Sequence, residues 1–300
     1  MSFYLMTQEL RQAHYRLPAY TAYNGAGIPY AYPPLGFYLA ALSADLARLP
    51  LLEAMRALPF LFAVLALPAF YALSRAVLGS RRRALLALCA MALMSKTFQW
   101  QLMGGGLTRS PGFFFAILAL RQGYLMYRRR QPRYAWGAGL LAGAALLSHL
   151  EMGFCVAYSM ALFWLLYGRN RAGLRHTALA GGAALLVSTP WWGSVLARHG
   201  LSPFAAALRH GSPWYGGLVQ ILSLRLLHEP LFPVLGSLAL LGLVLCLAQG
   251  RRFLPLWLAA MFLLDARGAH ITSVLPLALL AAWGMEQGLL PLLRRAAPPP

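Results

Sequence analysis

Runs of apolar residues alternate with short polar or arginine-rich segments along most of the chain. Each run is expected to form a helix, and a helix needs about 20 apolar residues to cross a hydrocarbon core of about 30 Å. The runs cover residues 53–77, 84–98, 113–127, 135–147, 152–167, 177–189, 231–248, 253–264 and 270–289. The pattern predicts an all-α, polytopic helical membrane protein with about 8–10 transmembrane helices plus interfacial helices.

The first 52 residues follow a different pattern. Residues 1–19 can form a short amphipathic helix, and residues 20–34 combine four tyrosines with glycines and prolines that prevent a regular element. The apolar run 35–46 is too short to span a membrane, and tyrosine-rich segments favour the membrane–water interface. We therefore expect an aromatic interfacial region on the outer face, although a loop followed by a first short span would fit the same pattern.

Two other segments complete the predicted organisation. The stretch 193–230 is long and amphipathic, and part of it is expected to be re-entrant. Residues 53–295 are predicted to form one transmembrane helical domain, and the proline-rich residues 296–300 a disordered tail. The segment 95–112, which contains Gly104, Gly105 and Gly106, is expected to be a glycine-rich loop.

Composition supports the membrane assignment and excludes one alternative. The chain is 60% hydrophobic and only 11% charged, with a mean hydropathy of +0.59. Its net charge of +19 could suggest a nucleic-acid partner, but the arginines form clusters between the apolar runs, as the positive-inside rule describes. The predicted partner is thus a lipid bilayer and no nucleic acid. The three cysteines lie inside apolar runs without metal-ligand spacing.

The arginine clusters also assign the two sides of the membrane. If the helix 35–46 does not cross the membrane, the successive crossings place all of the clusters on the same side. The positive-inside rule identifies that side as the cytoplasm. The clusters lie at residues 75–83, 128–133, 169–175, 251–252 and 294–295. Six of the seven acids fall on the opposite side; they are Glu9, Asp45, Glu53, Glu151, Glu229 and Asp265. This predicts a multi-pass protein of the cell membrane whose functional face points outward; the alternative is that acids simply avoid the cytoplasmic side.

Several outer-side residues could carry chemistry. His149 and Glu151 could supply a metal ligand or a general base, or could form a hydrogen-bonded pair at a helix end. Arg267 could hold a phosphate while Asp265 orients it, or the two could form a surface ion pair. Lys96 could contact a phosphate or snorkel.

The turn at Gly104–Gly106, with Arg109 beside it, could bind an anion through free amides near a helix start. A plain flexible turn would fit the same glycines.

Several segments resemble one family. They read YPPLGFYL at 32–39, MGGGLTRSPGFFFAILAL at 103–120, ALLSHLEMGF at 145–154, PWW at 190–192 and LLDARGAH at 263–270. This set resembles bacterial members of the GT-C superfamily, which are multi-spanning glycosyltransferases of the cell envelope that use polyprenyl-phosphate-linked sugars. A neighbouring family of bacterial membrane proteins, named after a pyruvoyl-tetrahydropterin-synthase-related domain, shares these features.

The resemblance implies sugar transfer from a polyprenyl-phosphate donor on the outer face. Acid or base roles would then belong to Glu151, Glu9 and His149. Contacts to the phosphate would come from Arg109, Lys96 and Arg267, with Asp265 at the binding site orienting the guanidinium. Aromatic contacts to the sugar or prenyl chain would come from Tyr32, Trp191 and Trp192. A divalent metal such as Mg²⁺ or Mn²⁺ could assist the leaving phosphate.

One departure from the family pattern leaves other functions open. In GT-C enzymes a spanning helix and a catalytic acid precede the segment that resembles SFYLMTQEL, whereas this chain starts at Met1 inside it. We therefore expect that the first transmembrane helix and its acid are missing. The alternatives are a non-catalytic membrane protein that keeps the fold, and a transporter of lipid-linked sugars, which would need more charged residues within its spans.

Overall fold

A computed structural model describes residues 2–209, 215–223, 226 and 233–296, without the side chains of Lys96, Leu208, Arg209 and Ala296. Glu229 and residues 297–300 of the predicted tail lie outside the described residues, as do parts of the predicted re-entrant stretch. The described residues are nearly all helical, which confirms the predicted all-α class.

The elements follow one another in this order: α1 (Ser2–Gln12), β1 (Tyr20–Thr21), the 3-10 turn η1 (Tyr23–Gly25), β2 (Ile28–Pro29), α2 (Leu35–Ala47), α3 (Leu51–Leu78), α4 (Arg81–Leu93), α5 (Ser95–Leu102), α6 (Gly106–Arg129), α7 (Pro132–Ser148), α8 (Leu150–Tyr167), α9 (Arg171–His199), α10 (Ser202–Arg209), α11 (Gly216–Leu222), α12 (Val234–Ala248), α13 (Phe253–Leu264), α14 (Ala269–Thr272), α15 (Val274–Gly284), the π-helical turn η2 (Met285–Leu289) and α16 (Leu290–Ala296).

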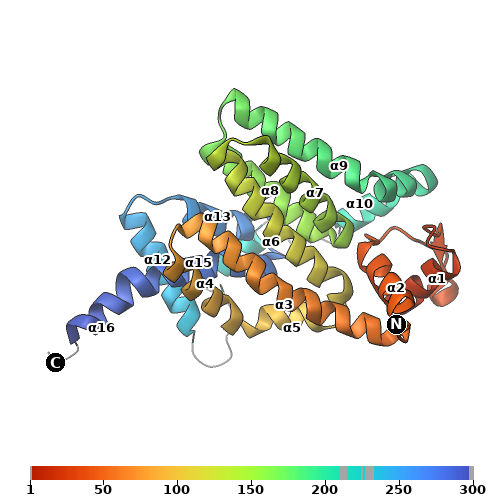
Figure 1. The fold of residues 1–300 in the computed structure, drawn as a ribbon, viewed down its shortest axis with the longest axis horizontal. Coiled ribbons are helices and arrows are strands. Elements are labelled where there is room, and N and C mark those ends of the chain that lie inside the picture. Colours follow the sequence, from red (N-terminus) through yellow and green to blue (C-terminus); the bar gives the residue numbers. More distant parts are fainter. Residues whose placement is uncertain (1, 210–214, 224–225, 227–232, 297–300) are drawn as a thin grey trace.

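The N-terminal region packs as a small lobe around α1 and α2, at one end of the molecule (Figure 1). Its core contains Leu10, Tyr30 and Phe37, all almost fully buried. The hydroxyl of Tyr30 donates a hydrogen bond to the carbonyl of Met6 at 2.8 Å, and β1 pairs with β2 in antiparallel register. The predicted amphipathic and short apolar helices are therefore present as α1 and α2.

Helix α6 lies at the centre of the larger helical region and packs against α3, α7 and α8. Glycines allow close helix pairs elsewhere, as is common where membrane helices associate. A Cβ atom on Gly139 of α7 would lie 2.5 Å from the Ala180 carbonyl oxygen of α9, and one on Gly242 of α12 would lie 1.9 Å from the Leu280 carbonyl oxygen of α15. The backbones at these two interfaces leave no space for a side chain.

Four helical segments of the described chain are long and apolar enough to cross a membrane: Leu51–Leu78, Leu150–Tyr167, Arg171–His199 and Ala269–Arg295. Three further apolar helices are shorter, at Leu35–Ala47, Val234–Ala248 and Phe253–Leu264. The chain is thus a helical membrane protein, and the total of eight to ten crossings stays a prediction.

Three predicted boundaries were wrong. Most of the expected loop 95–112 is helical, because α5 ends at Leu102 and α6 begins at Gly106. The predicted helix 84–98 is broken at Met94, whose ψ of 70° is not helical. Helix α9 continues through Pro190 to His199, although a helix end was expected at that proline. A proline removes one backbone hydrogen bond, and the packing of α9 on both sides of Pro190 offsets this loss.

The C-terminal half of α9 also holds the N-terminal lobe in place. Three of its side chains donate hydrogen bonds to backbone carbonyls of the segment 17–31. Trp191 Nε1 bonds to Ala31 at 3.2 Å, Arg198 Nη1 to Leu17 at 2.7 Å and His199 Nε2 to Ala19 at 2.8 Å. Because Ala19 offers only a carbonyl oxygen there, His199 Nε2 must carry the proton in this contact.

Candidate functional site

A cleft of about 360 Å³ lies where the N-terminal lobe meets α8, α9 and α10. Its lining combines aromatic rings with one acid, one histidine and one arginine. The lining residues are Ala31, Tyr32, Pro33, His149, Leu150, Glu151, Trp191, Pro203, Phe204, Ala207 and Arg267. The cleft therefore brings together residues that are more than 200 positions apart in the sequence.

The corner between α7 and α8 supplies the polar wall of the cleft. His149 separates the two helices in an extended conformation, with φ −155° and ψ 126°, so that Glu151 falls in the first turn of α8. A carboxylate is favourable in a first turn because the amides there carry partial positive charge. Gly112 allows the corner between α7 and α8 to pack closely against α6, because a Cβ atom at Gly112 would lie 3.0 Å from the Cβ of His149.

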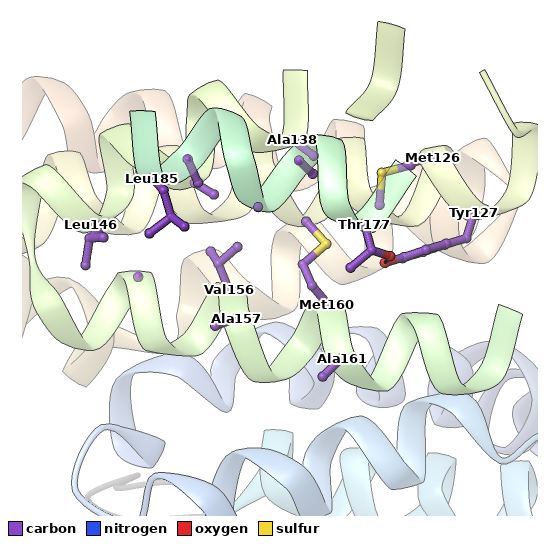
Figure 2. Close-up of a pocket in the computed structure, with 15 residues that line it drawn as sticks. Met126, Tyr127, Ala138, Leu146, Val156, Ala157, Met160, Ala161, Thr177 and Leu185 are labelled. Carbon is purple, nitrogen blue, oxygen red and sulfur yellow. Dashed lines mark hydrogen bonds between the residues drawn. The ribbon is translucent and has the colours of Figure 1, made fainter. Parts of the chain in front are cut away.

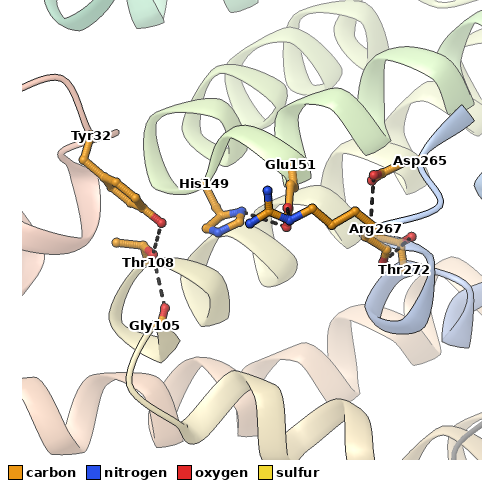
Figure 3. A network of polar contacts seen from close by, with 9 residues as sticks. Tyr32, Gly105, Thr108, His149, Glu151, Asp265, Arg267 and Thr272 are labelled. Atoms are coloured by element: carbon orange, nitrogen blue, oxygen red, sulfur yellow. Dashed lines mark hydrogen bonds and ion pairs between the residues drawn. The ribbon is translucent and has the colours of Figure 1, made fainter. Parts of the chain in front are cut away.

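Glu151 and Arg267 form an ion pair, with 3.2 Å between Oε1 and Nε (Figure 3). The Arg267 side chain is 55% exposed and that of Glu151 is 26% exposed. Partly solvated pairs of this kind contribute at most about 1 kcal/mol to stability. The pair therefore matters mainly because it places a cation beside a carboxylate at the cleft wall.

Asp265 lies next to this pair but has a different partner. Its Oδ1 accepts a hydrogen bond from the amide of Gly268 at 3.0 Å. Burial raises the pKa of Asp265, while the Gly268 amide and Arg267 act in the opposite direction. Asp265 had been expected to orient Arg267, whereas the carboxylate that pairs with the guanidinium in this structure is Glu151.

His149 is a neutral residue at physiological pH. Burial lowers its pKa to about 4, and the positive charges of Arg109 and Arg267 act in the same direction. Its Nδ1 lies 3.9 Å from Oε2 of Glu151, which is not an ion pair while the ring is neutral. This buried nitrogen has no hydrogen-bond partner among the described residues.

Tyr32 and the start of α6 form the neighbouring wall. The Tyr32 hydroxyl lies 3.4 Å from Oγ1 of Thr108, and its ring meets the His149 ring edge to face, with centroids 6.3 Å apart (Figure 3). Burial raises the pKa of Tyr32, so its phenol stays protonated at neutral pH. Next to Thr108, the guanidinium of Arg109 lies 5.3 Å from the centre of the Trp100 ring.

Five of the ten predicted site residues do not line the cleft: Arg109 and Asp265 lie close to it, and the other three lie elsewhere or are not described. Glu9 of α1 accepts a hydrogen bond from the Ala22 amide at 2.7 Å, which fixes the aromatic loop, and it does not line the cleft. Trp192 does not line the cleft either, whereas its neighbour Trp191 does. Lys96 belongs to α5, and its side chain is outside the described part of the structure.

Sequence reasoning missed one wall of the cleft. Phe204 of α10 packs against Trp191, with ring centroids 6.1 Å apart. It lies in the long amphipathic stretch, where no motif distinguished it from other apolar residues.

The donor set does not fit a divalent metal. Among the described residues, no group of three or more His, Cys, Asp or Glu side chains is arranged to hold a metal ion. Glu151 already faces Arg267, and the positive charge that lowers the pKa of His149 would also repel a cation. Arg267 on this wall, with Arg109 nearby, is suited to binding an anion.

A second cavity, of about 360 Å³, lies between α6, α7, α8 and α9 (Figure 2). Its lining is almost entirely apolar, with Met160 and Leu185 among the larger side chains. Its main polar feature is the hydrogen bond between Tyr127 and Thr177, at 2.7 Å. It contains no charged side chain and therefore offers no acid, base or phosphate contact.

The fold is that of a helical membrane protein with a polar and aromatic cleft. Two solved structures of the oligosaccharyltransferase of Archaeoglobus fulgidus share the fold. The apo form gives a TM-score of 0.56 at 16% identity and covers 98% of this chain and 47% of its own. The form described as a complex of AglB with an inhibitory peptide and a dolichol-phosphate gives a TM-score of 0.55 at 17% identity, covering 100% and 48%.

The chain thus spans about half the length of these structural relatives. A search of curated protein sequences gave no match. Residues 31–193, more than half of the chain, match the dolichyl-phosphate-mannose-protein mannosyltransferase family, and the chain belongs to that family. The predicted resemblance to GT-C proteins is confirmed.

Proposed function

We propose that this protein transfers a sugar from a polyprenyl- or dolichyl-phosphate donor to an acceptor hydroxyl at the outer face of the cell membrane. The observation that carries the proposal is the convergence of Glu151, Arg267, His149 and Tyr32 on one cleft beside Trp191. The cleft combines a carboxylate, a cation and aromatic surfaces. These are the groups that a phosphate-linked sugar requires.

In the proposed reaction Glu151 acts as the general base. It takes the proton of the acceptor hydroxyl, whose oxygen attacks the anomeric carbon of the sugar. A new glycosidic bond forms as the bond between that carbon and the phosphate oxygen breaks. The electron pair of the broken bond stays with the lipid phosphate, which leaves as an anion.

The cations stabilise the leaving group. Arg267 lies at the cleft wall, and Arg109 is close enough to influence the pKa of His149. A guanidinium presents paired N–H donors that match phosphate oxygens. Neutral His149, Trp191 and Tyr32 line the cleft and would contact the sugar ring. Since the donor set does not fit a metal, no step depends on one.

The arginine clusters support the proposed outward orientation. The cleft is on the side opposite to the arginine-rich C-terminal end of α6 and N-terminal end of α9. The positive-inside rule assigns those two ends to the cytoplasm. Single cysteines at Tyr20 and Arg169, in a variant without the native cysteines, would test this. A membrane-impermeant maleimide added to intact cells should label Tyr20→Cys and leave Arg169→Cys unlabelled, and the reverse result would contradict the orientation.

Activity is tested with purified protein and a radiolabelled mannosyl-phosphate lipid, scored by release of the lipid phosphate. Glu151→Gln should lower the rate about 100-fold or more, since general bases typically contribute that much. Glu53→Gln removes an exposed acid of α3 and should have no effect. Binding of the lipid without any turnover by the unmodified protein would contradict transfer and favour a non-catalytic role.

A further inference from the structure

A second polar cleft, of about 310 Å³, lies at the opposite end of the helical region. It is formed where α3, α6, α8, α12 and α15 end and α13 begins. Its lining residues are Val77, Leu78, Tyr124, Arg128, Tyr167, Cys246, Arg251, Arg252, Phe253, Leu254 and Trp283. Arg109 and Arg128 are 19 positions apart on α6, which at 1.5 Å per residue places this cleft about 30 Å from the candidate site. It is therefore a separate site.

All the charged residues that line this cleft are positive. Arg128, Arg251 and Arg252 line it, and none of the lining residues is acidic. The neighbouring Arg83 is different, because its guanidinium is hydrogen-bonded to Glu286 and its charge is balanced there. Three unbalanced cations around one cavity repel one another, and an anion between them would remove that repulsion.

The arginines are oriented by aromatic rings. The Arg251 guanidinium lies 4.4 Å from the centre of the Trp283 ring, and that of Arg128 lies 5.5 Å from the centre of the Tyr167 ring. Stacking uses the flat face of a guanidinium and leaves the N–H groups at its edge able to donate hydrogen bonds. The rings thus orient Arg251 and Arg128, and their edge N–H groups remain for an anion, apart from the hydrogen bond between Arg128 and Tyr124.

Further donors point to the same ligand. Trp283 is 4% exposed, and its buried Nε1–H has no acceptor among the described residues. The start of α13 contributes two amides without a partner in the helix, those of Phe253 and Leu254, because Pro255 has no N–H and the Leu256 amide bonds to the Arg252 carbonyl. A phosphodiester headgroup offers two charged oxygens in a tetrahedral arrangement, and a soluble phosphate offers three or four, so either can accept from donors on more than one wall.

We propose that this cleft binds a phosphate-bearing anion, either the headgroup of an anionic phospholipid or a soluble phosphate. The site lies among the arginine-rich helix ends, so its lipid would come from the leaflet on that side. It is independent of the proposed transfer reaction, because none of its residues lines the cleft that contains Glu151.

Binding is measured on the purified full chain in neutral detergent, with short-chain phosphatidylglycerol, phosphatidylcholine and inorganic phosphate as probes. Phosphatidylglycerol should bind at least about 10-fold more tightly than phosphatidylcholine, because the choline cation cancels the charge of its phosphate and is repelled by the three arginines. Competition by inorganic phosphate at millimolar concentration would identify a soluble anion as a sufficient ligand. Its absence would identify the lipid headgroup.

The double variant R251Q/R252Q should weaken phosphatidylglycerol binding about 10-fold or more. The matched control R169Q/R171Q removes two exposed arginines that do not line the cleft and should leave affinity within about 3-fold. Arg128→Gln, on another wall, should also weaken binding. Equal losses in the two double variants, equal affinity for both lipids, or no binding of either anion would overturn the proposal.

Discussion

The neutral state of His149 makes stability depend on pH in a defined direction. In the folded protein its pKa is lowered to about 4, against 6.5 for an unperturbed histidine. Between these two values the unfolded chain binds a proton that the folded protein does not bind. The free energy of unfolding must therefore decrease as pH falls through this window, and the loss is complete once the pH is below the folded pKa.

The size of the effect follows from the same two pKa values. One pKa unit corresponds to about 1.4 kcal/mol. The His149 contribution should therefore be about 2 kcal/mol smaller at pH 5, and about 3 kcal/mol smaller at pH 4, than at pH 7.5. Other groups also titrate in this range, so the quantity to measure is the difference between the wild-type protein and His149→Gln.

The assay is unfolding of the detergent-solubilised protein by sodium dodecyl sulfate, followed by tryptophan fluorescence at pH 7.5, 5 and 4. Wild type should lose more stability on acidification than His149→Gln, by the amounts given above. His14→Asn is the control, because His14 is exposed and its φ of 51° is one that asparagine adopts readily. This variant should follow wild type. If His149→Gln and wild type lost stability in parallel, the lowered pKa would be wrong.

Three further predictions concern packing, a hydrogen bond and the cleft. Gly242→Ala should destabilise the fold by about 1–3 kcal/mol in the same unfolding assay, because its Cβ would lie 1.9 Å from the Leu280 carbonyl oxygen. The control Gly181→Ala, whose Cβ would have nothing within 4 Å, should be neutral or slightly stabilising. Tyr30→Phe removes the buried bond to the Met6 carbonyl and should cost about 1 kcal/mol or more of unfolding free energy. Arg267→Lys keeps the positive charge but loses the paired N–H groups of the guanidinium. The KM for the lipid-phosphate-linked sugar should therefore rise about 10-fold in the turnover assay. An unchanged KM would exclude a contact between Arg267 and the phosphate.

The sequence predicted helices well where a long apolar run meets a strong terminator. The run 53–77 corresponds to α3 (Leu51–Leu78), which ends at Gly79 with a φ of 69°. Prediction failed at Pro190 because tertiary contacts decide whether a helix continues through a proline. It also failed at 95–112, where the glycines suggested a loop although only three residues separate α5 from α6.

The members of the candidate site were predictable in part, and their pairing was not. Charge and sidedness selected His149, Glu151 and Arg267, and the family resemblance added Tyr32; all four line one cleft. Sequence adjacency suggested Asp265 as the partner of Arg267, whereas the packing of α8 beside α13 brings Glu151 to it from 116 positions away. Such a pairing depends on helix packing and carries no local signal.

The hold of α9 on the N-terminal lobe has a consequence for how the cleft can change over evolution. Trp191, Arg198 and His199 bind main-chain carbonyls of the segment 17–31, and every residue type supplies such a carbonyl. The anchor thus places few demands on side chains in that segment. Ala31 is the residue of this segment that also lines the cleft, and it is held through its carbonyl, so a substitution there changes the rim while the bond from Trp191 remains. Its neighbour Tyr30 is buried in the lobe core and does not tolerate such changes. Position 31 is therefore the natural target for a library that alters what the cleft recognises.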